Sequence, residues 1–460
     1  MPRPVILLSV ALLLAAPLSA QQPAPAQLRA GVDSIALAAL RQDLTPGLSI
    51  AVVRGTDTLV MKGYGLADVE HDVPVTDRTV FRIGSLTKQF TSAAVMKLGE
   101  EGRIRLDATI ADYLPQYDGS GRGVTIHQLL NHTSGIPSYT GLGEAFWEKS
   151  RLDLTHEQML EMFEDDPLEF MPGTSWSHNN SGYYLLGMVI EAVTGESYEE
   201  YLARTQWQPL GLEQTSYCRQ AEIIPHRAEG YAVEAGVVIN APPLSMNLPG
   251  AAGALCSTPR DLVRWNDALT SGDVVNAPSY ATMIAPTRLL NDSTVDYGYG
   301  LAAGDLEGHA VVAHSGGING FSAYLSYYPE ADLTIAVLAN GPTATGRVQA
   351  DIARLVLGLP PREVAAVEEQ PLSDEQRARY VGTYDLAPAL PLQVNVFVQD
   401  GRLMAQGTGQ GAIPLSYQGG HRFLGPAGTG IEIEFTAEDG AVTGFTLRQG
   451  GGAFAARRVP

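Results

Sequence analysis

A glycine, a serine and a lysine at the start of a predicted helix constrain the chain most. Residues 81–88 read Phe-Arg-Ile-Gly-Ser-Leu-Thr-Lys, so Gly84 permits a sharp entry into a helix whose first turn holds Ser85. Lys88 follows three residues later, which places both side chains on one helical face, about 5–6 Å apart at Cβ. A hydroxyl is a weak nucleophile until a base takes its proton, and a lysine amine can serve if burial lowers its pKa. Ser-x-x-Lys is common by chance, so the pair predicts a serine nucleophile only in combination with other signals.

A second polar stretch stands directly before a buried helix expected over 183–193. His178 and Asn180 are two residues apart, so in an extended segment both side chains point to one side. Imidazole moves protons near neutral pH, and a carboxamide offers both a donor and an acceptor. The stretch alone leaves two interpretations open: the pair serves chemistry, or Asn180 or Ser181 merely caps the helix and His178 is incidental.

A third stretch runs as a predicted strand over 311–317 into a pair of glycines. His314 and Ser315 precede Gly316 and Gly317, where the backbone is open to close approach by a ligand. By itself this pattern also fits a glycine turn with an incidental histidine. Residues 125–135 predict a short helix that ends in a polar loop at Gly135, and Ser134 of that loop is another candidate hydroxyl. Without a base at helical distance, it is expected only to hydrogen-bond the turn.

In this order, Ser85-Leu-Thr-Lys88, His178-Asn-Asn180 and His314-Ser-Gly316 resemble the motifs of one enzyme family. It is the serine β-lactamase-like family, which includes class C β-lactamases, penicillin-binding DD-peptidases, family VIII esterases and D-aminopeptidases. The resemblance covers roughly residues 31–358, and the linked motifs make it specific. Residues 375–460 resemble the lipocalin-like β domain often fused behind such enzymes.

The resemblance implies a role for each motif residue. Ser85 would be the nucleophile, Lys88 its base, and the backbone N–H groups of Ser85 and Gly317 the oxyanion hole. Asn180 would contact the substrate and Lys88. The chain departs from the family at His178, where a tyrosine is usual. Because imidazole titrates near neutral pH, we predict that His178 keeps the acid–base role.

The third motif also departs from the family pattern. His314, Ser315 and Gly316 stand where Lys-Thr-Gly is expected, and all three would bind substrate. A lysine that grips a substrate carboxylate is replaced by a shorter, titrating group, which weakens the case for β-lactam hydrolysis in particular.

The implied fold is α/β (α+β): an antiparallel sheet flanked by helices, with an all-helical lobe, followed by a small all-β, barrel-like domain. The expected division of the chain is a signal peptide at 1–20, a flexible leader at 21–30, the hydrolase domain at 31–358, a linker at 359–374 and the all-β domain at 375–460. Residues 1–20 combine a positive end, an apolar stretch and small residues near Ala20, which predicts export to the periplasm or the exterior.

Composition excludes several classes of protein. The net charge of −20 and the absence of a basic run argue against nucleic-acid binding, and no later apolar run reaches the roughly 18 residues of a membrane span. The histidines are scattered, so no metal is expected, and no organic cofactor is implied. Cys218 and Cys256 allow one disulfide in an oxidising compartment, with two separate thiols as the alternative.

The leading hypothesis is an exported serine hydrolase that cleaves a small ester or amide, including a peptide with D-residues, through an acyl-enzyme on Ser85. Two rivals stay open: a β-lactamase or DD-carboxypeptidase of the same fold, and a penicillin-binding sensor or cell-wall binding protein without turnover. The sequence sets neither the substrate nor the oligomeric state.

Overall fold

The computed structural model describes residues 24–234, 236–362, 369–386, 393–408, 412–426, 431–438, 440–449 and 452–459. The expected signal peptide at 1–20 lies outside these residues. Within them, no helix is both long enough and apolar enough to cross a membrane.

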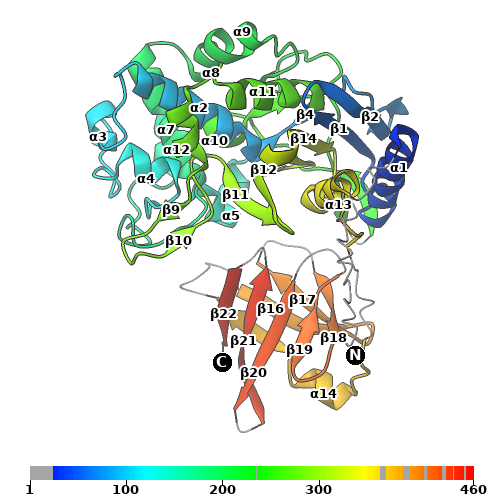
Figure 1. Ribbon diagram of the computed structural model, residues 1–460. Helices are drawn as coiled ribbons and strands as arrows, with labels where there is room; N and C mark the ends of the chain where they lie inside the picture. The colour runs from blue at the N-terminus through cyan, green and yellow to red at the C-terminus, as the bar shows by residue number, and fades with distance from the viewer. Residues whose placement is uncertain are drawn as a thin grey trace, which may run out of the picture.

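A seven-stranded antiparallel sheet forms the centre of the larger, N-terminal domain (Figure 1). Its strands run in the order β11 (Ala302–Leu306), β12 (His309–Ile318), β13 (Phe321–Tyr328), β14 (Leu333–Ala339), β1 (Gly47–Arg54), β2 (Asp57–Asp68) and β3 (Val73–Pro74). Strands β14 and β1 are buried along almost their whole length because helices cover both faces of the sheet. Their continuous apolar runs follow from that burial.

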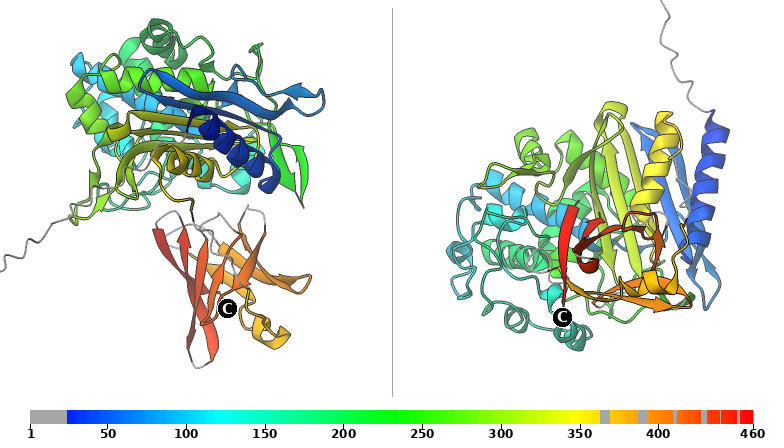
Figure 2. Two further views of the ribbon diagram at one scale, coloured as in Figure 1. Left: turned by 45° about the vertical axis from the view of Figure 1, so that its right-hand side comes forward. Right: turned by 90° about the horizontal axis from the view of Figure 1, so that it is seen from below.

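One face of the sheet packs on α1 (Pro25–Gln42) and α13 (Thr345–Leu357), which lie side by side in both views of Figure 2. Val32 and Ala36 of α1 meet Ile352 and Val356 of α13 in one apolar layer. Helix α1 starts at Pro25, earlier than expected, so residues 25–30 are helical rather than a flexible leader. Proline suits the first turn of a helix, where its missing N–H is not needed.

The other face packs on α11 (Pro259–Ser271) and on the helical lobe. The long helices of the lobe are α2 (Thr87–Glu100) and α7 (Asn180–Thr194), and α10 (Gly250–Gly253) contacts both. The shorter helices are α3 (Ile110–Tyr113), α4 (Ile126–Leu130), α5 (Glu144–Lys149), α6 (His156–Leu160), α8 (Tyr198–Leu202), α9 (Gln208–Leu210) and α12 (Ala277–Ile284), with single turns η1 (Gly84–Leu86), η2 (Tyr139–Gly141), η3 (Ala203–Trp207) and η4 (Pro329–Ala331).

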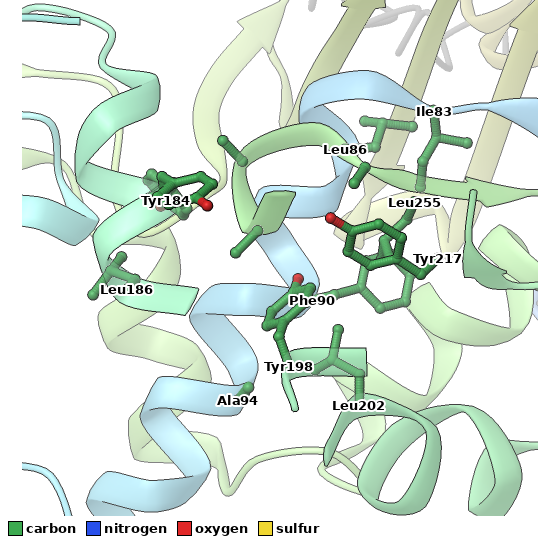
Figure 3. Close-up of a cluster of buried hydrophobic side chains, with 14 of the residues drawn as sticks. Ile83, Leu86, Phe90, Ala94, Tyr184, Leu186, Tyr198, Leu202, Tyr217 and Leu255 are labelled. Atoms are coloured by element: carbon green, nitrogen blue, oxygen red, sulfur yellow. The ribbon is translucent and has the colours of Figure 1, made fainter. Parts of the chain in front are cut away.

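Three small sheets complete the domain. In the first, β8 (Leu255–Ser257) lies between β4 (Phe81–Arg82) and β5 (Ser216–Tyr217). The other two pair β6 (Tyr231–Glu234) with β7 (Val237–Asn240), and β9 (Thr287–Arg288) with β10 (Thr294–Val295). Figure 3 shows the core beside the first of these sheets, where Phe90 and Ala94 of α2 meet side chains of α7 and α8. Phe90 also stacks on Trp265 of α11 at a centroid distance of 3.9 Å. Burial against α7 and α8 on one side and against α11 on the other therefore fixes the position of α2.

A short helix, α14 (Asp374–Ala378), precedes a closed antiparallel barrel of eight strands. The strands follow chain order: β15 (Gly382–Asp385), β16 (Gln393–Gln399), β17 (Arg402–Gly407), β18 (Ile413–Tyr417), β19 (Arg422–Leu424), β20 (Glu432–Glu438), β21 (Ala441–Gln449) and β22 (Gly452–Arg458). Aromatic rings of Tyr384, Phe423, Phe435 and Phe445 pack its interior. The predicted fold class is confirmed for both parts of the chain.

Candidate active site

The chain enters α2 through a turn that only glycine fits well. Gly84 has φ +51°, and a Cβ there would lie 2.9 Å from the backbone nitrogen of Gly317 on β12. This close approach sets the nucleophile turn η1 directly against the strand that carries the third motif. Ser85, within η1, is half-buried, whereas Lys88 is fully buried at the start of α2. The serine therefore remains accessible beside a lysine that water does not reach.

Lys88 is held by three acceptors. Its Nζ lies 3.0 Å from Ser85 Oγ, 2.8 Å from Asn180 Oδ1 and 2.9 Å from the carbonyl oxygen of Ala252 in α10. Burial lowers the pKa of Lys88 to about 7. When the amine is neutral, two N–H bonds satisfy Asn180 and Ala252, and the lone pair is left for the Ser85 hydroxyl proton. The geometry suits a base that takes the proton of Ser85.

Asn180 is the first residue of α7, and its neighbour Asn179 is the N-cap, with Oδ1 accepting from Gly182 N at 2.7 Å. Capping therefore falls to Asn179, a third position beside the two that the sequence offered. The Asn180 amide is engaged at both ends: Oδ1 accepts from Lys88, and Nδ2 donates to Thr140 Oγ1 at 3.1 Å. Ser138 Oγ accepts from the Asn180 backbone N–H at 3.2 Å.

His178 lies in the extended segment before α7. The residue is exposed, and its ring lies 4.8 Å from the ring of His132, measured between centroids. Desolvation, together with the charges of Lys88 and His314, lowers the pKa of His178 well below its ordinary range. The ring is therefore neutral at physiological pH, with one nitrogen to accept a proton and one to donate. Its acid–base role stays a prediction.

Strand β12 carries the third motif along the edge of η1. Ser315 and Gly317 are exposed, whereas His314 and Gly316 are buried, as the alternation of a strand requires. Both ring nitrogens of His314 already have partners: Nε2 lies 3.0 Å from Tyr297 Oη, and Nδ1 lies 2.6 Å from the carbonyl oxygen of Ser315. Burial and the charge of Lys88 lower the pKa of His314 to about 4. Direct contact between His314 and substrate stays a prediction, and it requires Tyr297 to move.

Gly316 is required by the packing of β12 on the nucleophile turn. A Cβ at this position would lie 2.0 Å from the carbonyl oxygen of Ile83. We expect Gly316→Ala to push β12 away from η1 and to lower the free energy of unfolding by about 1–3 kcal/mol. Urea unfolding followed by circular dichroism measures the change.

A matched control lies on the neighbouring strand. A Cβ at Gly304 of β11 would make only an ordinary 3.5 Å contact with Val311 Cγ1, so Gly304→Ala should change stability by less than about 0.5 kcal/mol. Equal effects of the two substitutions would contradict close packing at Gly316.

Several residues of the site were not identified from the sequence. Three of them, Ser138, Thr140 and the Ala252 carbonyl, bond Asn180 or Lys88. The other two are His132, which is buried beside His178, and Tyr297, which is buried beside His314. His132 has φ +62°, a conformation that a sequence does not reveal. The one available signal was the Tyr-Gly-Tyr-Gly run at 297–300. Its Gly300 packs so closely that a Cβ would lie 2.7 Å from the backbone of Lys88.

The two cysteines lie outside this cluster: Cys256 is in β8, and Cys218 directly follows β5. Cys218 and Cys256 are both buried and free, and a hydrogen bond between the two thiols lowers the pKa of Cys218. Formation of a disulfide stays a prediction. Among the described residues, no group of three or more His, Cys, Asp or Glu side chains is arranged to hold a metal ion. Ser134 Oγ accepts from Ile136 N at 3.2 Å, the turn-forming bond expected of it.

Comparison with known proteins identifies the family of the chain. Residues 32–359 match the family model described as Beta-lactamase. Penicillin-binding protein 4* of Bacillus subtilis (strain 168) is 29% identical over 424 residues, which cover 88% of this chain and 93% of that protein.

Two solved structures show the same fold. The octameric penicillin-binding protein homologue from Pyrococcus abyssi has a TM-score of 0.66 at 25% identity and covers 93% of this chain and 100% of its own. A D-stereospecific amidohydrolase from Streptomyces sp. has a TM-score of 0.62 at 29% identity and covers 71% of this chain and 98% of its own. The family match spans most of the sequence and includes all three motifs. The chain therefore belongs to the β-lactamase family of serine hydrolases.

Proposed function

We propose that this protein is an exported hydrolase of small amides or esters, including peptides that contain D-residues. It acts through an acyl-enzyme on Ser85, with Lys88 and His178 as its acid–base groups. The observation that carries the proposal is the 3.0 Å contact between Lys88 Nζ and Ser85 Oγ, because burial brings the lysine pKa to about 7. Similarity to a D-stereospecific amidohydrolase supports amides of D-residues as the first substrates to test.

The contact between Lys88 and Ser85 supports the first of the proposed chemical steps, and the later steps are part of the proposal. Ser85 Oγ attacks the carbonyl carbon while its proton passes to the neutral Lys88 amine. The negative charge that develops on the carbonyl oxygen is stabilised by the backbone N–H groups of Ser85 and Gly317. The leaving group takes a proton from Lys88, directly or through His178, whose neutral ring can accept at one nitrogen and donate at the other. Water then attacks the acyl carbon and gives a proton to the neutral Lys88 amine or the His178 ring, and that proton passes to Ser85 Oγ as it leaves.

Active-site labelling tests the proposal. A fluorophosphonate probe should react with the folded protein at a single serine, and peptide mapping should identify Ser85 rather than Ser134. The labelled protein should lose its hydrolysis of D-amino acid p-nitroanilides and of p-nitrophenyl esters. A label on any serine other than Ser85, or full activity after labelling of Ser85, would refute the assignment.

A second candidate function keeps the fold but changes the substrate. Similarity to penicillin-binding protein 4* favours a DD-carboxypeptidase or β-lactamase, and efficient hydrolysis of a chromogenic cephalosporin would support it. His314 argues against β-lactams as substrates, because its ring is buried, is uncharged at neutral pH and has a hydrogen-bond partner at each nitrogen. A single burst of p-nitrophenol without steady turnover would instead indicate a sensor that acylates once.

A further inference from the structure

Four consecutive hydrogen bonds join the helical lobe to the sheet behind the proposed catalytic groups. The backbone N–H of Asn179 donates to His132 Nδ1 at 3.1 Å, and His132 Nε2 lies 3.2 Å from Tyr297 Oη. Tyr297 Oη lies 3.0 Å from His314 Nε2, and His314 Nδ1 lies 2.6 Å from the carbonyl oxygen of Ser315. We call these three side chains the His–Tyr–His chain. All three are more than nine-tenths buried.

The two backbone ends fix the direction of every bond. A backbone N–H can only donate, so His132 Nδ1 carries no proton and a neutral His132 has its proton on Nε2. A carbonyl can only accept, so His314 Nδ1 carries the proton and the Nε2 of a neutral ring must accept. Tyr297 therefore accepts from His132 and donates to His314. Each donor in these four hydrogen bonds meets an acceptor only when both imidazoles are neutral.

Tyr183 offers Tyr297 a competing acceptor, because its hydroxyl is also near Tyr297. The Tyr183 hydroxyl already donates to the Leu130 carbonyl at 2.7 Å and lies 3.0 Å from Ser92 Oγ. If Tyr297 donated to Tyr183 instead, His314 would need protons on both nitrogens to satisfy Tyr297 and Ser315. A buried imidazolium near Lys88 is unfavourable, and burial and that charge already lower the pKa of His314 to about 4.

The ends of the His–Tyr–His chain lie next to the groups that the chemistry needs. Asn179 stands between His178 and Asn180, and Ser315 stands two residues before Gly317. The three side chains therefore connect the segment carrying the imidazole and the carboxamide to the strand carrying the oxyanion N–H. The middle member, Tyr297, belongs to the 297–300 segment that packs on the backbone of Lys88.

We propose that His132 and Tyr297 are positioning residues that hold the His178–Asn180 segment and strand β12 in register and keep His314 as an uncharged acceptor. This inference rests on the proposed hydrolase function. Its consequence is substrate selection: where a lysine would offer a fixed positive charge, this site offers none. The site therefore favours substrates that are uncharged next to β12, such as amides and esters of amino acids, over substrates with a carboxylate there.

The tautomers provide a test that does not depend on turnover. Two-bond ¹H–¹⁵N correlation spectra of the full protein at pH 7 should show His132 protonated at Nε2 and His314 protonated at Nδ1. In Tyr297→Phe, both rings lose their shared partner, so the chemical shift of Nε2 should move in each ring, while the backbone partners of Nδ1 keep both tautomers. The opposite tautomer at either ring, or unchanged spectra in Tyr297→Phe, would overturn the proposal.

Kinetics then separate positioning from general packing. Tyr297→Phe should lower kcat/KM for an amino acid amide about 10- to 100-fold. Tyr299→Phe is the matched control, because Tyr299 is also buried and bonds a histidine, His127 Nδ1 at 2.5 Å, outside the His–Tyr–His chain. The control should stay within about twofold of the parent when both variants are equally stable. Equal losses in the two variants would reduce Tyr297 to a packing residue.

Substitution of His314 tests the direction of the hydrogen bond between Tyr297 and His314. A glutamine can accept from Tyr297 and donate to Ser315, whereas a lysine has only donors and leaves the Tyr297 proton without its acceptor. His314→Gln should therefore retain at least tenfold more kcat/KM toward a neutral amide than His314→Lys, and the reverse order would overturn the proposal. If the parent hydrolyses no ester or amide, the proposed function fails, and the tautomer spectra still decide whether the His–Tyr–His chain exists.

Discussion

Lys88→Met is expected to lower kcat/KM for an amide or ester by about 10⁴-fold, the upper end of the range for loss of a general base. Methionine fills the buried volume of the lysine stem but cannot accept the Ser85 proton. The loss should appear mainly in kcat, because Lys88 is fully buried and acts on the proton of Ser85 rather than on the bound substrate. Steady-state kinetics on a p-nitrophenyl ester, after circular dichroism has shown a folded variant, measure it.

The matched control is Lys97→Met on the same helix. Lys97 pairs with Glu100 at 3.2 Å on the surface, and 44% of its side chain is exposed, so activity should change by less than about twofold.

The pH profile of the parent enzyme supplies an independent check on the role of Lys88. Because burial lowers the pKa of Lys88 to about 7, more of the amine is neutral as pH rises, and kcat/KM should climb through pH 7 to a plateau. Activity of Lys88→Met within tenfold of the parent would remove lysine from the role of base.

The sequence alone predicted those contacts of the candidate site that depend on local spacing along the chain. Ser85 and Lys88 are three residues apart on one helical turn, and a hydrogen bond joins them in the structure. The contact between Lys88 and Asn180, which are 92 residues apart, was expected only because the family resemblance joined two motifs. The antiparallel sheet, the helical lobe and the eight-stranded barrel agree with that resemblance.

What the sequence could not supply depends on long-range packing. His132 and Tyr297 are 165 residues apart, and neither belongs to a motif with a known spacing. The left-handed backbone of His132 and the burial of His314 are products of the tertiary fold. The motif alone therefore predicted that His314 contacts the substrate, and it did not reveal that both ring nitrogens have partners within the protein. The same limit applies to the N-cap of α7, where Asn179 rather than Asn180 caps, since either side chain suits the position.

The departure at His178 gives the other large expected effect. His178→Phe keeps a ring against His132 but removes both nitrogens, and we expect kcat/KM to fall about 10²- to 10³-fold because proton transfer to the leaving group loses its relay. His178→Tyr restores the residue usual in the family. A phenol has a pKa near 10, well above that of imidazole, so this variant should recover part of the rate only at higher pH.

Comparison of leaving groups makes the result specific to proton transfer. The loss in His178→Phe should be large for an alkyl amide, whose leaving nitrogen must be protonated, and small for a p-nitrophenyl ester, whose leaving group departs as a stable anion. His309→Phe, at the first residue of β12, is the control and should leave both rates within about twofold of the parent. If His178→Phe keeps alkyl-amide activity within a few-fold of the parent, His178 is only a spacer, and Lys88 alone must carry the proton to the leaving group.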